Sequence, residues 1–252
     1  MTYDSRKLLE RMSQRIPAGQ KRGRRWEDFS RRLDLHFGQL FGLLLELYGN
    51  TFDFLYFVED LIFSMWDSYR QWSRSLVLMD SKREHNPDWF SHQRMVGAIV
   101  YVDLYAETLK GVRDKIDYLE ELGITYLHLM PLFDVPDGDS DGGYAVSSYR
   151  DVQQQLGTMD DLRELAVLLR RKGITLVLDF ILNHTSDQHI WARKAIEGDP
   201  YYKDFYYLFP DRREPDEYNL HLRDIFPEAR TGSFTYRDDI GKWVWTTFNT
   251  YQ

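Results

Sequence analysis

The sequence predicts a mixed α/β protein in which a helical N-terminal region precedes a parallel sheet. Between Trp26 and Trp72, apolar residues recur every three or four positions, which is the period of amphipathic helices. From Gly97 onward, short apolar runs alternate with helical patterns, and Gly-Ile-Thr opens such a run both at Gly123 and at Gly173. Strands that alternate with helices favour βαβ crossovers and therefore a parallel sheet.

The helical region is predicted to hold two long helices. The first runs from Trp26 to Tyr48 and ends at Gly49, and the second follows Thr51, a residue type suited to N-capping. Residues 1–25 are polar and become basic near their end, so we expect a solvated segment there rather than a nucleic-acid arm. The Asn-Pro-Asp sequence at 86–88 disfavours helix before its proline, and residues 1–90 are predicted to form a helical domain.

The alternating region is predicted to begin with a buried strand from Gly97 to Leu104 and a helix from Leu109 to Leu122 that Gly123 closes. A strand over 124–131 follows, then a helix that Thr158 caps, with Asp161 in the capping-box position, and that ends at Gly173. These elements and the strand at Thr175 make a domain of residues 91–182. Residues 183–252, a stretch of about 70, are too long for an ordinary loop and are predicted to form a functional excursion or a small subdomain.

Polar residues gather where two predicted strands end. Asp179 interrupts an apolar run, and Asn183 and His184 follow it. An unpartnered buried carboxylate costs several kcal/mol, so Asp179 is expected to have a hydrogen-bond or ionic partner. Asp141 and Tyr144 lie in the loop after the preceding strand, and loops that follow parallel strands leave the same edge of a sheet. An acid, a phenol, an amide and an imidazole that converge there suit a polyhydroxyl ligand, whereas each residue alone is more often structural.

Composition excludes several other classes. The net charge of −8 argues against nucleic acid as the main partner, and the absence of cysteine excludes disulfide and thiol chemistry. No strand leads into a phosphate-binding glycine motif or a nucleophile elbow, and the spacing of His184 and His189 matches no zinc motif. We find no signal peptide and no run long enough to cross a membrane. A cytoplasmic protein is the simplest inference, although a mature secreted chain has the same features.

Two of these stretches carry a family resemblance. Asp179-Phe-Ile-Leu-Asn183-His184, preceded by Asp141-Gly-Gly-Tyr144, resembles signature regions of the α-amylase superfamily, glycoside hydrolase family 13. The stretches 101–104, 126–132, 140–149 and 243–248, and the helical region before residue 90, resemble the amylosucrases within it. The resemblance implies an incomplete (β/α)8 TIM barrel, holding about three of the eight βα units. It also implies transfer of glucose from sucrose to an α-1,4-glucan with release of fructose.

The resemblance implies roles for individual residues. Asp141, Tyr144 and His184 would hold the glucosyl ring, with Asp141 paired to an arginine and Tyr144 stacked on the sugar face. Asp179 and Asn183 would support the site, and the acceptor subsite would be bordered by Arg223 and Phe248. Some relatives bind calcium near the position of Asn183, but amylosucrases do not generally depend on it. We therefore expect no metal and no cofactor.

The retaining reaction needs a nucleophile and an acid/base, two carboxyl groups about 5–5.5 Å apart. In the family they follow the fourth and fifth barrel strands, with a further aspartate after the seventh, and we expect all three to lie beyond this chain. The chain is therefore predicted to be the N-terminal part of an enzyme, inactive alone and completed by the missing C-terminal part. The alternatives are a sucrose hydrolase, another retaining α-glucosidase such as a trehalose-forming isomerase, and a non-catalytic sugar-binding fragment.

Overall fold

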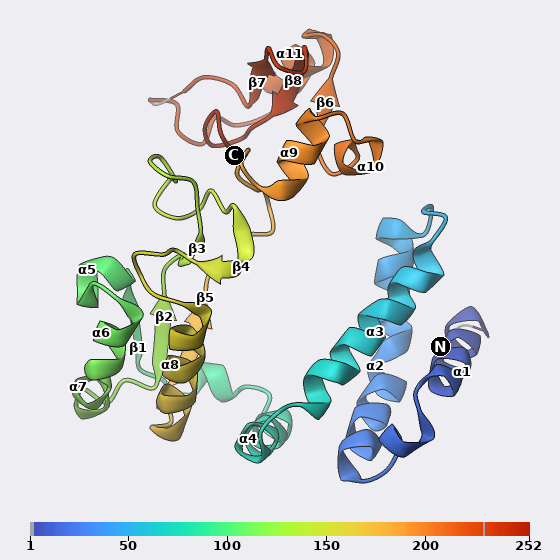
Figure 1. Ribbon diagram of the computed structural model, residues 1–252, viewed down its shortest axis with the longest axis vertical. Helices are drawn as coiled ribbons and strands as arrows, with labels where there is room; N and C mark the ends of the chain where they lie inside the picture. The colour runs from blue at the N-terminus through green and yellow to red at the C-terminus, as the bar shows by residue number, and fades with distance from the viewer. Residues whose placement is uncertain (1–2, 229) are drawn as a thin grey trace. The chain divides into compact units, whose positions relative to one another are not determined.

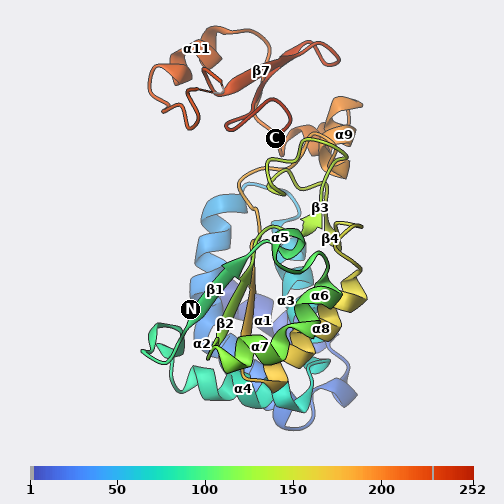
Figure 2. The same ribbon diagram turned by 90° about the vertical axis from the view of Figure 1, so that its left-hand side faces the viewer.

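The computed structural model describes residues 3–228 and 230–252, and the chain divides into two compact units, one up to Trp89 and one from Phe90 to Gln252. Figures 1 and 2 show the first unit as helices and the second as a mixture of helices and short strands. The mixed α/β class predicted from the sequence is confirmed.

In its described residues the first unit contains four α-helices, α1 (Tyr3–Arg15), α2 (Arg24–Tyr48), α3 (Phe54–Arg70) and α4 (Arg74–Glu84), with a 3₁₀ turn at Ala18–Gln20. The long helices α2 and α3 bury aromatic and aliphatic side chains against α1, and Phe37, Val58 and Ile62 lie at the centre of this core. Burial of such side chains is the main force that holds short helices together.

Two expectations for this unit are wrong. The start of the chain is not a solvated segment, because it buries Leu8, Met12 and Ile16 in the core of the unit. Their spacing of four places Leu8 and Met12 on one face of α1, and Ile16 follows directly after the helix ends. Thr51 does not cap the second long helix, which begins at Phe54 after Asp53. The Thr51 hydroxyl instead donates to the carbonyl oxygen of Tyr48 at 2.8 Å and closes the turn after α2.

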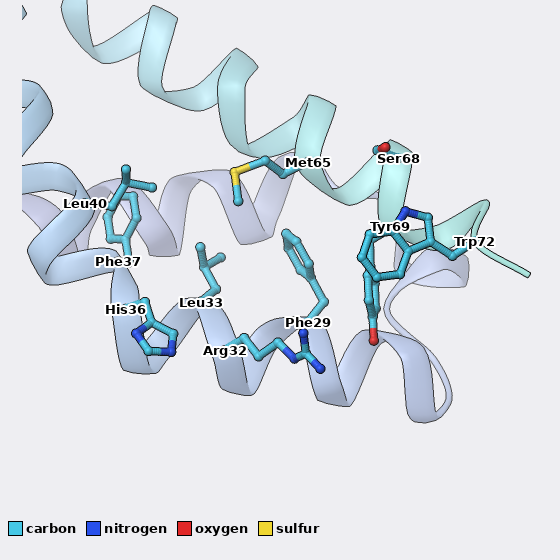
Figure 3. Close-up of a pocket in the computed structure, with 10 residues that line it drawn as sticks. All are labelled: Phe29, Arg32, Leu33, His36, Phe37, Leu40, Met65, Ser68, Tyr69 and Trp72. Carbon is cyan, nitrogen blue, oxygen red and sulfur yellow. The ribbon is translucent and has the colours of Figure 1, made fainter. Parts of the chain in front are cut away.

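A hollow of about 380 Å³ lies between α2 and α3 (Figure 3). Apolar side chains dominate its lining, and Arg32, His36 and Ser68 supply the polar groups. The full lining is Phe29, Arg32, Leu33, His36, Phe37, Leu40, Met65, Ser68, Tyr69 and Trp72. None of the candidate sugar-binding residues lies in this unit.

The second unit is built on a three-stranded parallel sheet in the order β1-β2-β5, with strands β1 (Gly97–Val100), β2 (Tyr126–Leu129) and β5 (Thr175–Leu178). Tyr126 is in register with both Gly97 and Thr175. The crossover from β1 to β2 contains α5 (Val102–Ala106), α6 (Leu109–Asp114) and α7 (Ile116–Glu121), and the crossover to β5 contains α8 (Met159–Arg171). Figures 1 and 2 show α6, α7 and α8 beside the sheet. The parallel pairing of β1 with β2 and of β2 with β5 confirms the predicted parallel sheet.

The helix-capping predictions made for Gly123, Gly173 and Thr158 in this unit are confirmed. Gly123 and Gly173 have φ angles of 75° and 77°, the left-handed conformation that closes a helix. Thr158 and Asp161 form a complete capping box at the start of α8, because the Asp161 carboxylate accepts from the Thr158 backbone as Glu or Gln does in the usual box.

The strands are shorter and less buried than predicted. The first ends at Val100, since residues 102–106 are helical, and the predicted helix over 109–122 is broken at Lys115. Within the second unit, the described helices pack on one face of the sheet, where Leu127 and Leu129 are fully buried, whereas Ile99 on the opposite face is 66% exposed. Ile99 and His128 are in register on the other face, so the two-sided burial expected for these strands is not observed.

Two long segments follow the strands. Strands β3 (Phe133–Asp134) and β4 (Ser148–Val152) pair antiparallel and frame the first. The second contains α9 (Ile190–Ile196), α10 (Pro200–Lys203), β6 (Leu208–Phe209), α11 (Arg213–Asn219), β7 (Phe234–Arg237) and β8 (Lys242–Trp245). Its strands form an antiparallel sheet in the order β6-β8-β7 (Figure 1). No helix among the described residues combines the length and the apolar character that a membrane crossing requires.

Candidate functional site

A polar cluster lies at the carboxyl ends of β2 and β5, and Asp179 is at its base. One carboxylate oxygen of Asp179 contacts Nε2 of His128 at 2.9 Å, and the other accepts the Tyr144 hydroxyl at 3.5 Å. The expectation that Asp179 has a partner is therefore confirmed. Burial and then the neighbouring Asp179 raise the pKa of the Tyr144 phenol above its ordinary value of 10.0, so this hydroxyl remains a hydrogen-bond donor to a higher pH than an ordinary phenol.

His184 connects the two loops. Its Nε2 lies 3.2 Å from the carbonyl oxygen of Tyr144, and its Nδ1 lies 3.0 Å from the side-chain amide nitrogen of Asn183. A carbonyl oxygen only accepts and an amide nitrogen only donates, so these contacts assign the proton to Nε2 of a neutral imidazole. Burial lowers the pKa of His184, and the Tyr144 carbonyl, Asp141 and Gln252 oppose that effect. The neutral tautomer is thus the form that this environment favours.

The exit from β5 is fixed by a residue of β4. The Tyr149 hydroxyl donates to the carbonyl oxygens of Ile181 and His184, the latter at 3.2 Å. Its ring also stacks on Phe180, with centroids 5.0 Å apart. Tyr149 therefore holds the backbone that presents His184.

The loop before Tyr144 has an unusual backbone. Asp141 adopts a φ of 52° and Gly143 a φ of 95°, both in the left-handed region. The amides of Gly143 and Ala145 both donate to the carbonyl oxygen of Ser140, at 3.1 and 2.9 Å. A Cβ atom on Gly143 would lie 2.8 Å from the Pro131 carbonyl oxygen, so the loop approaches the end of β2 as closely as it does because this residue is glycine.

Asp141 is exposed on this loop, and its Oδ2 accepts a hydrogen bond of 2.8 Å from the side-chain amide of Gln252. The resemblance implies an arginine as its partner. In the described part of the chain the partner is Gln252 instead. A neutral donor thus orients this carboxylate, and Asp141 forms no ion pair with the residues that the structure describes.

Of the two residues expected near the acceptor subsite, one joins the cluster. The Phe248 ring lies 5.1 Å from the His184 ring, and Phe226 lies 6.2 Å from Phe248. Arg223 is exposed and makes no hydrogen bond or ion pair with the residues that the structure describes. The structure thus brings together Asp141, Tyr144, Asp179, Asn183, His184 and Phe248, but not Arg223.

Two residues of the cluster were not singled out from the sequence. His128 is a lone imidazole in an apolar strand and is in register with Val177. Val177 precedes Asp179 by two positions, so His128 and Asp179 lie on the same face of the sheet. Applying the two-residue period of a strand to both runs would have paired His128 with Asp179. Gln252 is 111 residues from Asp141, and nothing in the sequence indicates that contact.

Parallel strands, helical crossovers and a polar cluster at the carboxyl ends of the strands define a domain of the α/β barrel class. The chain belongs to the α-amylase family: residues 78–249 match the family described as alpha amylase, catalytic domain.

Individual relatives agree with this assignment. The salivary alpha-glucosidase of Aedes aegypti is 38% identical over 131 residues, covering 52% of this chain and 22% of that protein. The trehalose synthase/amylase of Mycolicibacterium smegmatis is 32% identical over 173 residues, covering 66% and 28%. The structure of a mutant isomaltulose synthase from Erwinia rhapontici with its natural substrate sucrose aligns with a TM-score of 0.54 and 26% identity, covering 63% of this chain and 29% of that one. The chain thus spans less than a third of the length of each of these proteins.

Proposed function

We propose that this chain forms one side of the glucosyl-binding pocket of a retaining α-glucoside-acting enzyme, with sucrose as the glucosyl donor and an α-1,4-glucan as the acceptor. The contact between His184 and the Tyr144 carbonyl carries the proposal, because it joins the loops after β2 and β5 around one polar cluster. Membership of the α-amylase family supports an α-glucoside as the ligand.

The proposed roles follow from the chemistry of each group. Gln252 engages Oδ2 of Asp141, and Oδ1 is left to accept a hydrogen bond from a sugar hydroxyl. The Tyr144 ring offers an apolar face to a pyranose, and its hydroxyl is held by Asp179. Both nitrogens of His184 contact the protein, and the exposed amide of Asn183 is the partner that a hydroxyl displaces more easily. We assign Phe248, and with it Arg223, to the acceptor side.

Sucrose as the donor is supported by the isomaltulose synthase structure, which contains sucrose as its natural substrate. A second candidate is hydrolysis of α-glucosides, which the likeness to the salivary alpha-glucosidase supports. Both reactions use the same glucosyl pocket and differ in the acceptor, a glucan in one case and water in the other.

Ligand binding by the full chain tests the proposal. We expect glucose and sucrose to bind with a dissociation constant on the order of 1 mM or weaker, about −4 kcal/mol, since one wall of a pocket supplies only part of its contacts. Binding is measured by NMR titration of the amide signals, and Asp141→Ala should abolish the shifts around Tyr144 and His184. Unchanged spectra in both sugars, or equal shifts in Asp141→Ala, would refute the pocket assignment.

Turnover gives a separate test. We expect no release of fructose by the chain alone, because retaining transfer needs a carboxylate nucleophile and a carboxyl acid/base, and the two carboxylates of this cluster, Asp141 and Asp179, are assigned to sugar binding and to support of the site. Residues 97–248 placed in the isomaltulose synthase of Erwinia rhapontici should support sucrose turnover. Asp141→Ala in that chimera should lower kcat/KM by about 100-fold or more, as expected for lost substrate positioning. Products formed with and without maltooligosaccharide distinguish transfer from hydrolysis.

A further inference from the structure

Residues 246–252, here called the 246–252 segment, contact the rest of the second unit at several points, and three of these contacts bear on the position of Asp141. The first is Arg230, whose guanidinium donates to the carbonyl oxygen of Thr246 at 2.6 Å, to its hydroxyl at 2.8 Å and to the carbonyl oxygen of Asn249. Burial lowers the pKa of Arg230, because the guanidinium loses part of its hydration at this position. The turn that carries Phe248 is therefore fixed by a partly buried charge.

The second attachment joins this segment to the loop after β5. The carbonyl oxygen of Tyr251 accepts from the backbone amide of Asp187 at 2.8 Å. The carboxylate of Asp187 in turn accepts from Arg237 of β7 at 2.9 Å. Tyr251 and its neighbour Gln252 are thereby placed beside the residues that follow His184.

The third attachment is the hydrogen bond of 2.8 Å from Nε2 of Gln252 to Oδ2 of Asp141. Gln252 is only 6% exposed, and its buried Oε1 has no partner of normal hydrogen-bond geometry among the described residues, although the Gln252 side chain is near enough to raise the pKa of His184. A buried polar side chain normally satisfies both its donor and its acceptor. An acceptor left open beside a candidate ligand carboxylate is the pattern expected where a ligand hydroxyl supplies the missing partner.

We propose that Gln252 is a positioning residue for Asp141 in the glucosyl pocket, an inference that rests on the proposed function. Asp141 lies on an exposed loop in a left-handed conformation, and its carboxylate needs an external group to fix its direction. The Gln252 amide supplies that group without neutralising the charge, so Oδ1 stays available to a sugar hydroxyl. The Gln252 carbonyl oxygen is then the second acceptor on the same side of the pocket.

The experiment compares variants of the full chain. Gln252→Glu keeps the shape but replaces the donor with a second carboxylate, whereas Gln252→Lys keeps a donor that can reach Asp141. Gln188→Glu, at an exposed position of the same unit, is the matched control for added charge. We expect Gln252→Glu to weaken glucose binding by about tenfold, Gln252→Lys to remain within about threefold of the parent chain, and Gln188→Glu to have no effect.

A second readout needs no sugar. The amides of Gly143 and Ala145 report the Asp141 loop, because both donate to the Ser140 carbonyl oxygen. Their hydrogen exchange should accelerate in Gln252→Glu and stay at the parent rate in Gln252→Lys and Gln188→Glu. If the parent chain binds no glucose, the proposed function fails while this readout still decides whether Gln252 holds the loop. Parent-like glucose affinity together with parent-like exchange in Gln252→Glu would overturn the inference and leave the proposed function standing.

Discussion

Nε2 of His184 lies 3.2 Å from the carbonyl oxygen of Tyr144, a residue 40 positions earlier in the chain. This contact joins the loop that follows β2 to the loop that follows β5. Parallel pairing of the two strands sets their carboxyl ends side by side, and the contact then fixes how the loops meet. The proposed pocket depends on this contact between the two loops.

Two substitutions of Tyr144 separate the role of its aromatic ring from the role of its hydroxyl group. Tyr144→Phe removes a long hydrogen bond to Asp179, which retains His128, so the free energy of unfolding should fall by at most about 1 kcal/mol. Glucose binding should stay near that of the parent chain because the ring face is kept. Tyr144→Ala should lose binding, as measured by NMR titration, and a Phe variant as defective as the Ala variant would show that stacking is not the role of this ring.

The lowered pKa values of His184 and His189 make the stability of the second unit depend on pH. Burial lowers the pKa of both from the ordinary value of 6.5, so the unfolded chain binds protons more readily than the folded one. Their contribution to stability is complete above pH 6.5 and is lost as the pH falls through 6.5 to the lowered pKa values. The free energy of unfolding of the second unit, followed by denaturant titration, should therefore fall in this window.

The matched variants for this effect are His189→Gln and, at an exposed position of the same unit, His221→Gln. His189→Gln should flatten the pH dependence between pH 6.5 and the lowered pKa of His189, and His221→Gln should leave it unchanged. Equal slopes in the parent chain and His189→Gln would contradict the assignment.

Gly143 and Gly138 form a matched pair for the approach of the loop to β2. Both have a φ of 95°, but a Cβ on Gly143 would lie 2.8 Å from the Pro131 carbonyl oxygen, whereas nothing lies within 4 Å of one on Gly138. Each Gly→Ala change incurs the left-handed penalty of about 1–2 kcal/mol. Gly143→Ala should cost more in thermal or denaturant unfolding and should also weaken glucose binding. Equal costs at the two positions would mean that the loop moves away from Pro131 freely.

Substitution of Glu59 tests how α1 is attached to α3 in the helical unit. Its carboxylate is fully buried in α3 and pairs with Arg11 and Arg15 of α1, both of which are about half exposed. Glu59→Gln should lower the free energy of unfolding of this unit by about 1–3 kcal/mol, the usual worth of hydrogen bonds to a charged group. The control is Asp60→Asn, at the exposed neighbouring position. If the two variants were equally stable, the pairing of α1 with α3 would not depend on this carboxylate.

The sequence was sufficient for the fold class because the relevant signals are local. The helical period between Trp26 and Trp72, the capping box at Thr158 and the glycines at 123 and 173 each act within a few residues, and the structure contains the corresponding helices and turns. It was insufficient at α1, where charges obscured the stripe of Leu8, Met12 and Ile16. The first strand was predicted too long because the periodicity of a short apolar run does not distinguish a strand from a buried helix, and the β-branched Val102 lies in a helix.

The candidate site was predictable where the strand order alone decides proximity. Tyr144, Asp179 and His184 lie at adjacent strand ends, so parallel topology brings them together. Gln252 was not predictable, because its contact with Asp141 depends on how the whole excursion folds back. The arginine expected opposite Asp141 followed from the family resemblance and not from the residues themselves, and the described chain places an amide there.

Assigned NMR spectra of the full chain, recorded during a glucose titration, test the central claim most directly. The account predicts that the signals of Asp141, Tyr144 and His184 shift together and saturate with one dissociation constant, and that Asp141→Ala removes all three responses. Shifts that follow different binding curves, or that occur at only one of the two loops, would contradict a single glucosyl pocket.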